Sequence, residues 1–364
     1  MISFGMTEEQ EVVREAMRDY AEQAVRPLAR EADESSELPS DFLDQVWELG
    51  LTSTQIPEAY GGGGEERSPI TNAIVLEELA HGDAALAIAA LAPSLLANAI
   101  VDQGTETQKQ TLLPAFCGER FHAGSLAVVE PGAFFDPRTP KTKVEPKGEG
   151  FVLSGVKSFV PLGDRAENIL VTARNNGGLD AFIVPCAAEG VTISQNEKNL
   201  GLRALPTSTI ELERVELGPE ARLGGDAGCD MARILNASRT ALAAVMLGLS
   251  RAVLEYCVPY AKDREAFDEP IAKKQSIAFR LSQMHIDIEA TRWLVWKAAS
   301  QLEQGLDATR AAHFAYGYAA EKAMWIADNG VQVLGGHGFI REHPVELWFR
   351  GARTLSVLEG TVTV

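Results

Sequence analysis

The sequence is short of positive charge, of clustered cysteine and of long apolar runs. Its 364 residues hold 33 lysines and arginines against 51 aspartates and glutamates, a formal net charge of −18. Binding nucleic acid over the whole surface needs the opposite sign, so general nucleic-acid binding is excluded. We expect no apolar run to approach the roughly 20 residues that span a bilayer, and therefore no membrane span.

Cysteine is scarce and scattered. The four residues, Cys117, Cys186, Cys229 and Cys257, form no CxxC pair. This argues against a disulfide framework or a zinc site and indicates a reducing compartment. The first residues are acidic and helical in pattern rather than typical of a signal peptide. We therefore expect a cytoplasmic protein.

What the sequence does contain is enough apolar material for a folded core. Hydrophobic residues make up 46% and charged residues 23% of the chain, which is typical of a globular protein. The length predicts about two or three domains.

Hydrophobic spacing predicts helices in the first third. Thr7 and Gln10 form a capping box before a helix, residues 41–49 predict a second short helix, and residues 56–64 predict a loop. Residues 70–104 predict one long, buried helix. His81 lies within it and is interpreted as a partly exposed histidine rather than a catalytic one.

The periodicity then changes twice. Short β-branched runs between residues 151 and 217 predict a β-rich middle, and long helices follow from about residue 231. The predicted domains are 1–120 (helical), 121–222 (β) and 223–364 (a four-helix bundle type). The fold class is α+β, with a central β domain between two helical ones.

Common cofactor and nucleophile motifs are missing. No GxGxxG follows a strand, and neither GxxxxGK[ST] nor GxSxG is present. His337 and His343 have no cysteine or carboxylate at ligand spacing, so no metal site is expected. Composition and periodicity alone leave the function open.

A series of local signatures is more specific, and in order it resembles the acyl-CoA dehydrogenase family over essentially the whole chain. The segments concerned are 7–27, 48–64, 104–120, 126–137, 153–174, 264–284 and 332–361. The resemblance implies noncovalent FAD, an acyl-CoA substrate and α,β-dehydrogenation, with electrons passed to an electron-transferring flavoprotein.

The resemblance also implies roles for residues near the C-terminal signature. Glu359, in LEGT, matches the base that removes the α-proton, and Gly360 after it allows close approach to the ligand. Arg239 matches an arginine near this glutamate and the CoA chain. Some family members place the base just before that arginine, but Ser238 stands there and cannot serve as one.

Two groups of residues match the family's cofactor contacts. Expected on the flavin side are the backbone of Val128 and Val129, the ring of Phe159, and Thr361. Residues matched to the FAD of an adjacent subunit are Arg264, Phe267, Gln275, Gln332, Gly335 and Gly336. Contacts across a subunit boundary imply at least a dimer, and the resemblance implies a homotetramer.

On the flavin side, the chain lacks a hydroxyl of the family's pattern at three positions. Val129 and Pro161 replace threonines, and Phe135 replaces a serine along the pantetheine and substrate path. Each lost hydroxyl bond is worth roughly 0.5–1.5 kcal/mol. An alternative is therefore a flavin-poor or non-catalytic subunit of a heteromer. An oxidase or monooxygenase acting on a non-CoA substrate is disfavoured by Glu359.

The C-terminal end differs as well. The chain stops at EGTVTV, where relatives continue through another helix. We expect either a naturally short member or a cut chain. Neither the acyl group nor the choice between homo- and hetero-oligomer can be predicted from the sequence.

Overall fold

Local sequence signals set the helix boundaries of the N-terminal part. The computed structural model describes residues 5–176 and 178–364. Thr7 caps α1 (Glu8–Tyr20) with the predicted box, because its hydroxyl accepts the Gln10 N–H at 3.2 Å and its own N–H donates to the Gln10 side chain at 3.0 Å. The helices that follow are η1 (Ala21–Val25), α2 (Arg26–Ser35), α3 (Phe42–Trp47), η2 (Glu58–Tyr60), α4 (Pro69–Gly82), α5 (Ala84–Gln103), α6 (Glu106–Leu112) and η3 (Leu113–Cys117).

The single helix predicted over residues 70–104 is two helices. Asp83 has extended backbone and its carboxylate accepts the N–H of Leu86 at 2.9 Å, so it ends α4 and caps α5. The interpretation of His81 is also wrong in one respect. Its side chain is 2% exposed, and its ring contacts Arg26 at 3.0 Å and Glu255 at 2.8 Å, so it is a partnered core residue.

The middle of the chain is a seven-stranded sheet of order β1-β4-β2-β3-β7-β6, with β5 paired to β4. β1 runs parallel to β4, and most other pairs are antiparallel. The strands are β1 (Gly124–Ala127), β2 (Lys143–Lys147), β3 (Gly150–Pro161), β4 (Asn168–Asn175), β5 (Gly178–Pro185), β6 (Val191–Ile193) and β7 (Thr207–Leu217).

Long helices return after the sheet and pack against one another, and the first two of them also pack on α4. They are α7 (Met231–Asp263), α8 (Gln275–Glu303), α9 (Thr309–Leu334) and α10 (Val345–Leu355). A two-stranded hairpin, β8 (Glu265–Ala266) with β9 (Glu269–Pro270), joins α7 to α8. Short turns complete the set: η4 (Pro219–Ala221), η5 (Gly225–Ala227), η6 (Ile271–Lys273) and η7 (Gly335–Phe339).

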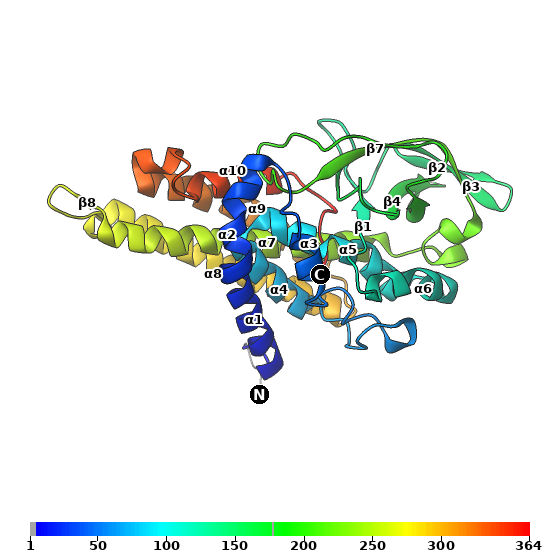
Figure 1. Cartoon of the computed structure of the whole chain (residues 1–364), viewed down its shortest axis with the longest axis horizontal. Helices are drawn as coiled ribbons and strands as arrows, with labels where there is room; N and C mark the ends of the chain where they lie inside the picture. The colour runs from blue at the N-terminus through cyan, green and yellow to red at the C-terminus, as the bar shows by residue number, and fades with distance from the viewer. Residues whose placement is uncertain (1–4, 177) are drawn as a thin grey trace.

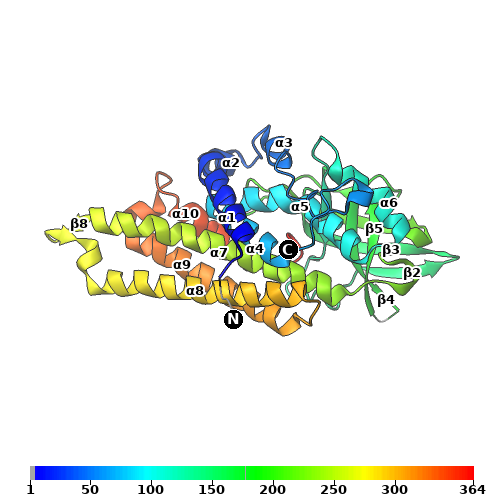
Figure 2. The same cartoon turned by 90° about the horizontal axis from the view of Figure 1, so that it is seen from below.

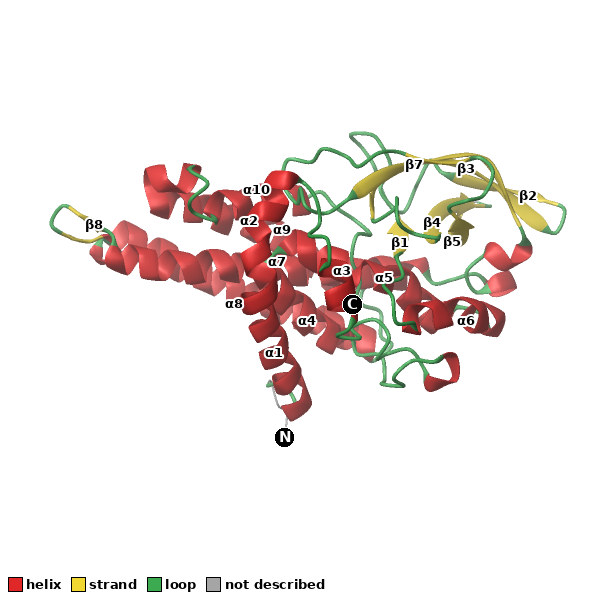
Figure 3. Ribbon diagram, in the orientation of Figure 1, coloured by secondary structure: helices red, strands yellow, loops and turns green. Residues whose placement is uncertain are grey.

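The sheet and the hairpin mark opposite ends of the molecule. Figures 1 and 3 show the sheet over one end of the helices and the β8 hairpin at the other. Figure 2 shows α7, α8 and α9 running side by side between them. The predicted α+β class, with a β domain between helical ones, is confirmed.

Two helices are longer and more apolar than the sequence prediction allowed. α5 and a window of α7, with mean hydropathy 2.0 and 1.6, pass the length and composition test for a membrane span. The prediction that no apolar run reaches that length is therefore wrong. The helices are nevertheless 94% and 78% buried inside the fold over those windows, as expected for core helices of a folded domain.

Candidate active site

Glu359 lies in the short segment after α10 and is held by Arg239 of α7. The Arg239 Nη2 donates to Glu359 Oε1 at 2.7 Å, and its Nε lies 3.0 and 3.1 Å from the two carboxylate oxygens. Each side chain is 14% exposed. The sequence placed both residues in one site, and the structure brings them together from positions 120 residues apart.

The backbone on either side of Glu359 is anchored as well. Ser238, which precedes Arg239 on α7, accepts the N–H of Gly360 at 3.0 Å through its buried hydroxyl. Tyr316 of α9 donates its hydroxyl to the carbonyl of Leu358 at 2.7 Å. Burial, and then the charge of Glu359, raises the pKa of Tyr316, so the phenol remains a donor. Sequence reasoning assigned no such role to either residue, because Ser238 was considered only as a possible base and Tyr316 stands in no motif.

Gly360 brings this segment against the strand that carries the expected flavin contacts. Its φ is 71°, and a Cβ built there would lie 2.3 Å from Cγ2 of Val128. Only glycine permits this conformation and this approach without displacing Val128. The contact joins the C-terminal segment to the end of β1.

A buried ion pair contacts the backbone of Val128, at the end of β1. Lys157 of β3 is fully buried, and its Nζ lies 2.9 Å from Glu130, 3.2 Å from the carbonyl of Val128 and 3.1 Å from the hydroxyl of Thr172. Burial lowers the pKa of Lys157 to about 8, against the opposing effect of Glu130. A lysine as the only charged residue of this strand was the sequence signal for the pair, and it was missed.

Phe159 has an unusual backbone next to this pair. Its φ is 55°, and the pairing of β3 with β7 shifts register between Lys157 and Val160. The N–H of Phe159 donates to the carboxylate of Glu197 at 3.2 Å. Bulges and positive φ at a large side chain concentrate at functional sites. Glu197 was not foreseen, and no local motif marks it.

One residue of this segment offers a free polar group to a cofactor, whereas other residues around it offer none. Thr361 is 1% exposed, and within residues 5–176 and 178–364 its hydroxyl has no hydrogen-bond partner, so it is available to a ligand. Val129 and Pro161 offer no hydroxyl. Phe135 is half-buried against the cluster that contains Val128. We call the residues 128–130, 157–159, 238–239, 316 and 358–361 the catalytic cluster.

The second predicted cofactor group lies elsewhere. The β8–β9 hairpin and η7 lie at the end of the molecule opposite the sheet (Figure 1). Exposed positions at that end are Arg264, Phe267, Gln275, Gln332, Gly335 and Gly336. Phe267 is 90% exposed, and a Cβ at Gly336 would meet nothing within 4 Å. We call residues 264–275 and 332–339 the distal tip. Within one chain the structure does not bring the distal tip to Glu359.

Comparison with known proteins identifies the fold. Family models of the acyl-CoA dehydrogenase N-terminal, middle and C-terminal domains match residues 7–120, 125–215 and 228–364. The chain is 33% identical to a 3-(aryl)acrylate reductase of Clostridium sporogenes, covering 98% of this chain and 96% of that protein. It is 31% identical to a subunit of the caffeyl-CoA reductase–Etf complex of Acetobacterium woodii, covering 98% and 96%.

A solved structure agrees over the whole chain. Butyryl-CoA dehydrogenase of Megasphaera elsdenii superposes with a TM-score of 0.89 at 30% identity, covering 100% of this chain and 96% of that one. The chain therefore belongs to the acyl-CoA dehydrogenase family, and the resemblance predicted from its motifs is confirmed.

Proposed function

We propose that this acyl-CoA dehydrogenase family member oxidises the α,β bond of an acyl-CoA thioester with Glu359 as the base. The observation that carries the proposal is the Glu359–Arg239 pair, set against Val128 through Gly360. This cluster coincides with the motif positions at which the sequence placed the chemistry.

The chemistry requires both a base and a fixed environment for the thioester. The α-proton of a thioester is weakly acidic, so the base must be positioned and the developing enolate oxygen needs donors. Ser238 and Tyr316 fix the backbone on both sides of Glu359, which holds its N–H in one orientation as a donor. Arg239 holds the carboxylate before substrate binds, and its charge is available to an anionic substrate.

FAD is the cofactor that the residues suit. The hydroxyl of Thr361, the backbone of Val128 and Val129 and the ring of Phe159 would hold its flavin part. The chemistry that FAD supplies when bound is acceptance of the β-hydrogen as hydride at N5. The exposed Arg264 and the open space at Gly336 suit the FAD of a second copy, which implies an oligomer, proposed here as a homotetramer.

The proposed electron partner is an electron-transferring flavoprotein, and the proposed location is the cytoplasm. A relative that belongs to an Etf complex supports the partner. Reductases among the relatives are consistent with the same hydrogen transfer run in either direction, with the electron partner setting the direction. The acyl class is left to experiment.

The test is reconstitution. The purified chain is mixed with FAD, its visible spectrum is recorded, and a panel of saturated acyl-CoA thioesters is added without oxygen. Bleaching of the flavin by at least one thioester is expected. A stoichiometric flavin that no thioester of the panel reduces would contradict the proposal.

The alternative, a flavin-poor subunit of a heteromer, is favoured by one specific observation. Val129, Phe135 and Pro161 lack the hydroxyls that would bind flavin, whereas the distal tip keeps Arg264. Such a chain would lend the distal tip to a partner's FAD. A stoichiometric flavin spectrum from the chain purified alone would remove this alternative.

A further inference from the structure

The buried pair of Lys157 and Glu130 takes no part in the proposed proton transfer, yet it contacts the backbone expected to hold the flavin. The side chain of Lys157 is 0% exposed and that of Glu130 is 5% exposed. A buried ion pair is weak evidence for stability, because apolar residues of similar volume in the same place are often as stable. Stability alone therefore does not account for two charged groups at this position.

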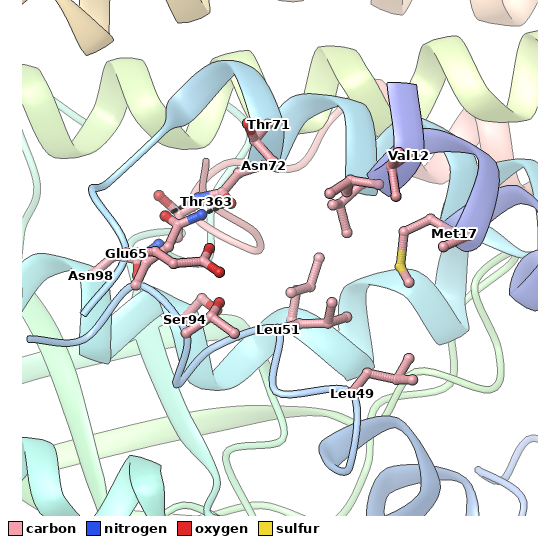
Figure 4. A pocket seen from close by; sticks show the side chains of 16 residues that line it. Val12, Met17, Leu49, Leu51, Glu65, Thr71, Asn72, Ser94, Asn98 and Thr363 are labelled. Carbon is pink, nitrogen blue, oxygen red and sulfur yellow. Dashed lines mark hydrogen bonds between the residues drawn. The ribbon is translucent and has the colours of Figure 1, made fainter. Parts of the chain in front are cut away.

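Both members of the pair are charged at neutral pH. Burial acts to raise the pKa of Glu130, but the charge of Lys157 and the bonds with Thr142 outweigh it, so the pKa is lowered. Burial lowers the pKa of Lys157 only to about 8. Neither residue lines the cavity of about 250 Å³ between α1, α4 and α5 that Figure 4 shows. The buried ammonium therefore acts on its neighbours with little screening by water.

The ammonium of Lys157 uses all three of its donors. They lie 2.9 Å from Glu130 Oε1, 3.1 Å from the hydroxyl of Thr172 and 3.2 Å from the carbonyl oxygen of Val128. The last of these contacts polarises the peptide unit that joins Val128 to Val129, which strengthens the N–H of the same unit as a donor. That N–H belongs to Val129. Because the C=O and N–H of a trans peptide point in opposite directions, it points away from the buried lysine.

The N–H of Val129 is free to bind a ligand. It forms no hydrogen bond within residues 5–176 and 178–364, whereas the carbonyl of Val129 accepts the N–H of Ser158 at 2.9 Å. The valine side chain carries no hydroxyl, so this N–H is the only donor at position 129. A fixed donor favours the state of its partner that carries more negative charge, and reduction adds electron density to the flavin ring.

We propose that Lys157 is a positioning residue that sets the flavin potential: through the carbonyl of Val128 it strengthens the Val129 N–H and thereby favours reduced over oxidised FAD. Glu130 offsets the lysine charge at longer range, so the effect is confined to the peptide unit that Lys157 touches. The inference rests on the proposed binding of FAD at this site. It depends neither on Glu359 as the base nor on the acyl group.

The test is a redox titration of the FAD-reconstituted chain against a reference dye, without acyl-CoA. Glu130→Gln/Lys157→Met removes both charges and leaves no unpaired charge buried. The preference for reduced FAD should fall by roughly ten-fold, which is a midpoint potential about 30 mV lower for a two-electron couple. An unchanged potential would overturn the inference, and so would a wild-type chain that binds no FAD. A chain that binds FAD which no thioester reduces contradicts only the proposed function, because this titration needs no substrate.

A matched variant separates this effect from general loosening of the fold. Asp33→Asn/Arg350→Met removes another buried pair, which joins α2 to α10 at 2.7 and 2.9 Å and bonds to no residue of the catalytic cluster. Its flavin potential should equal that of the wild type, and an equal fall in both double variants would refute the role of Lys157. Melting temperatures show that each variant folds.

A milder substitution keeps the inference testable if the first double variant does not fold. Glu130→Gln/Lys157→Gln retains amide donors in place of the ammonium but removes both charges. A smaller fall of the potential in the same direction is expected, because a neutral donor polarises the Val128 carbonyl less than an ammonium does. A wild-type potential in this variant would also overturn the inference.

Discussion

The catalytic cluster and the distal tip differ in how completely one chain satisfies them. In the catalytic cluster the polar groups that hold Glu359 and its neighbours come from two helices of the same chain, α7 and α9, at 2.7–3.1 Å. In the distal tip Arg264, Phe267 and Gln332 are exposed. Folding of one chain satisfies the polar groups of the catalytic cluster, whereas the side chains of the distal tip face solvent.

The distal tip is exposed without being loosely built. Tyr260 bonds to His337 at 2.9 Å and Tyr256 to His343 at 2.7 Å, and the two imidazole rings stack at 5.4 Å between centroids. These contacts fix the backbone of η7, where Gly335 and Gly336 lie open. A rigid, open surface suits recognition by a second chain, since little conformational entropy is lost on binding. We therefore predict that one chain is enough to position the base, whereas tight binding of the cofactor needs two chains.

The largest expected effect is the loss of the base at the catalytic cluster. Glu359→Gln keeps the shape of the side chain but removes the proton acceptor, so the rate of flavin bleaching by acyl-CoA should fall by roughly 10²–10⁴. Stopped-flow absorbance without oxygen measures this rate. Glu48→Gln, at an exposed position away from the cluster, is the matched control. Retention of the wild-type rate in Glu359→Gln would assign the base elsewhere.

The next effect tests whether the distal tip serves a second chain. Arg264→Gln removes charge-assisted bonds to phosphate and should weaken FAD by roughly ten- to a hundred-fold, as measured by flavin fluorescence. If sites are shared, re-associating Arg264→Gln with Glu359→Gln chains in equal amounts should restore about a quarter of wild-type activity in a dimer. Half of the dimers are mixed, and one of the two sites in each is intact. No recovery from the mixture would mean that both residues act within one chain.

A smaller effect probes the support behind the base. Ser238→Ala leaves the buried N–H of Gly360 without its acceptor, which costs about 1–3 kcal/mol. We expect roughly a ten-fold loss in kcat with little change in KM. Ser250→Ala is a matched control, because that buried serine on the same helix bonds only to its own helix, at the carbonyl of Met246. Equal losses in both variants would show a general effect of the helix rather than positioning of Glu359.

The smallest effect concerns the pH dependence of stability, at Asp83, which caps α5. Burial raises the pKa of Asp83 from 3.8 to about 6. The folded protein then binds this proton more tightly than the unfolded chain does. The contribution of Asp83 to stability is therefore fully present below about pH 4 and is lost as pH rises through about 6. Asp83→Asn keeps the helix cap and should flatten the pH dependence of Tm by a few degrees. Circular dichroism melts from pH 4 to 7 measure it, and an unchanged slope would contradict the assignment.

Sequence reasoning was most successful where the signal was local. The Thr7 box and the change from helical to β periodicity near the middle of the chain were correct. It failed at Asp83, because the apolar stretch over residues 70–104 was read as one helix although Gly82 lies in it, and the capping carboxylate was overlooked. It failed at His81 because burial by Arg26 and Glu255 comes from helices distant in sequence.

The candidate site divides in the same way. Glu359, Gly360 and Arg239 stand in recognisable motifs, and the structure places them together. Ser238, Tyr316, Lys157 and Glu197 act through contacts that no motif encodes. Their roles in the proposed mechanism, and those of the distal tip, remain predictions for the experiments above.

Local sequence pattern was enough to predict the family, the succession of helical and β regions and the proposed base. Which groups hold that base, and which side chains face outward, depends on packing between distant segments. The bond from Ser238 to Gly360 joins positions 122 residues apart, and that from Tyr316 to Leu358 joins positions 42 apart. Packing of α7 and α9 against the end of α10 creates both, and such long-range contacts leave no mark in local sequence.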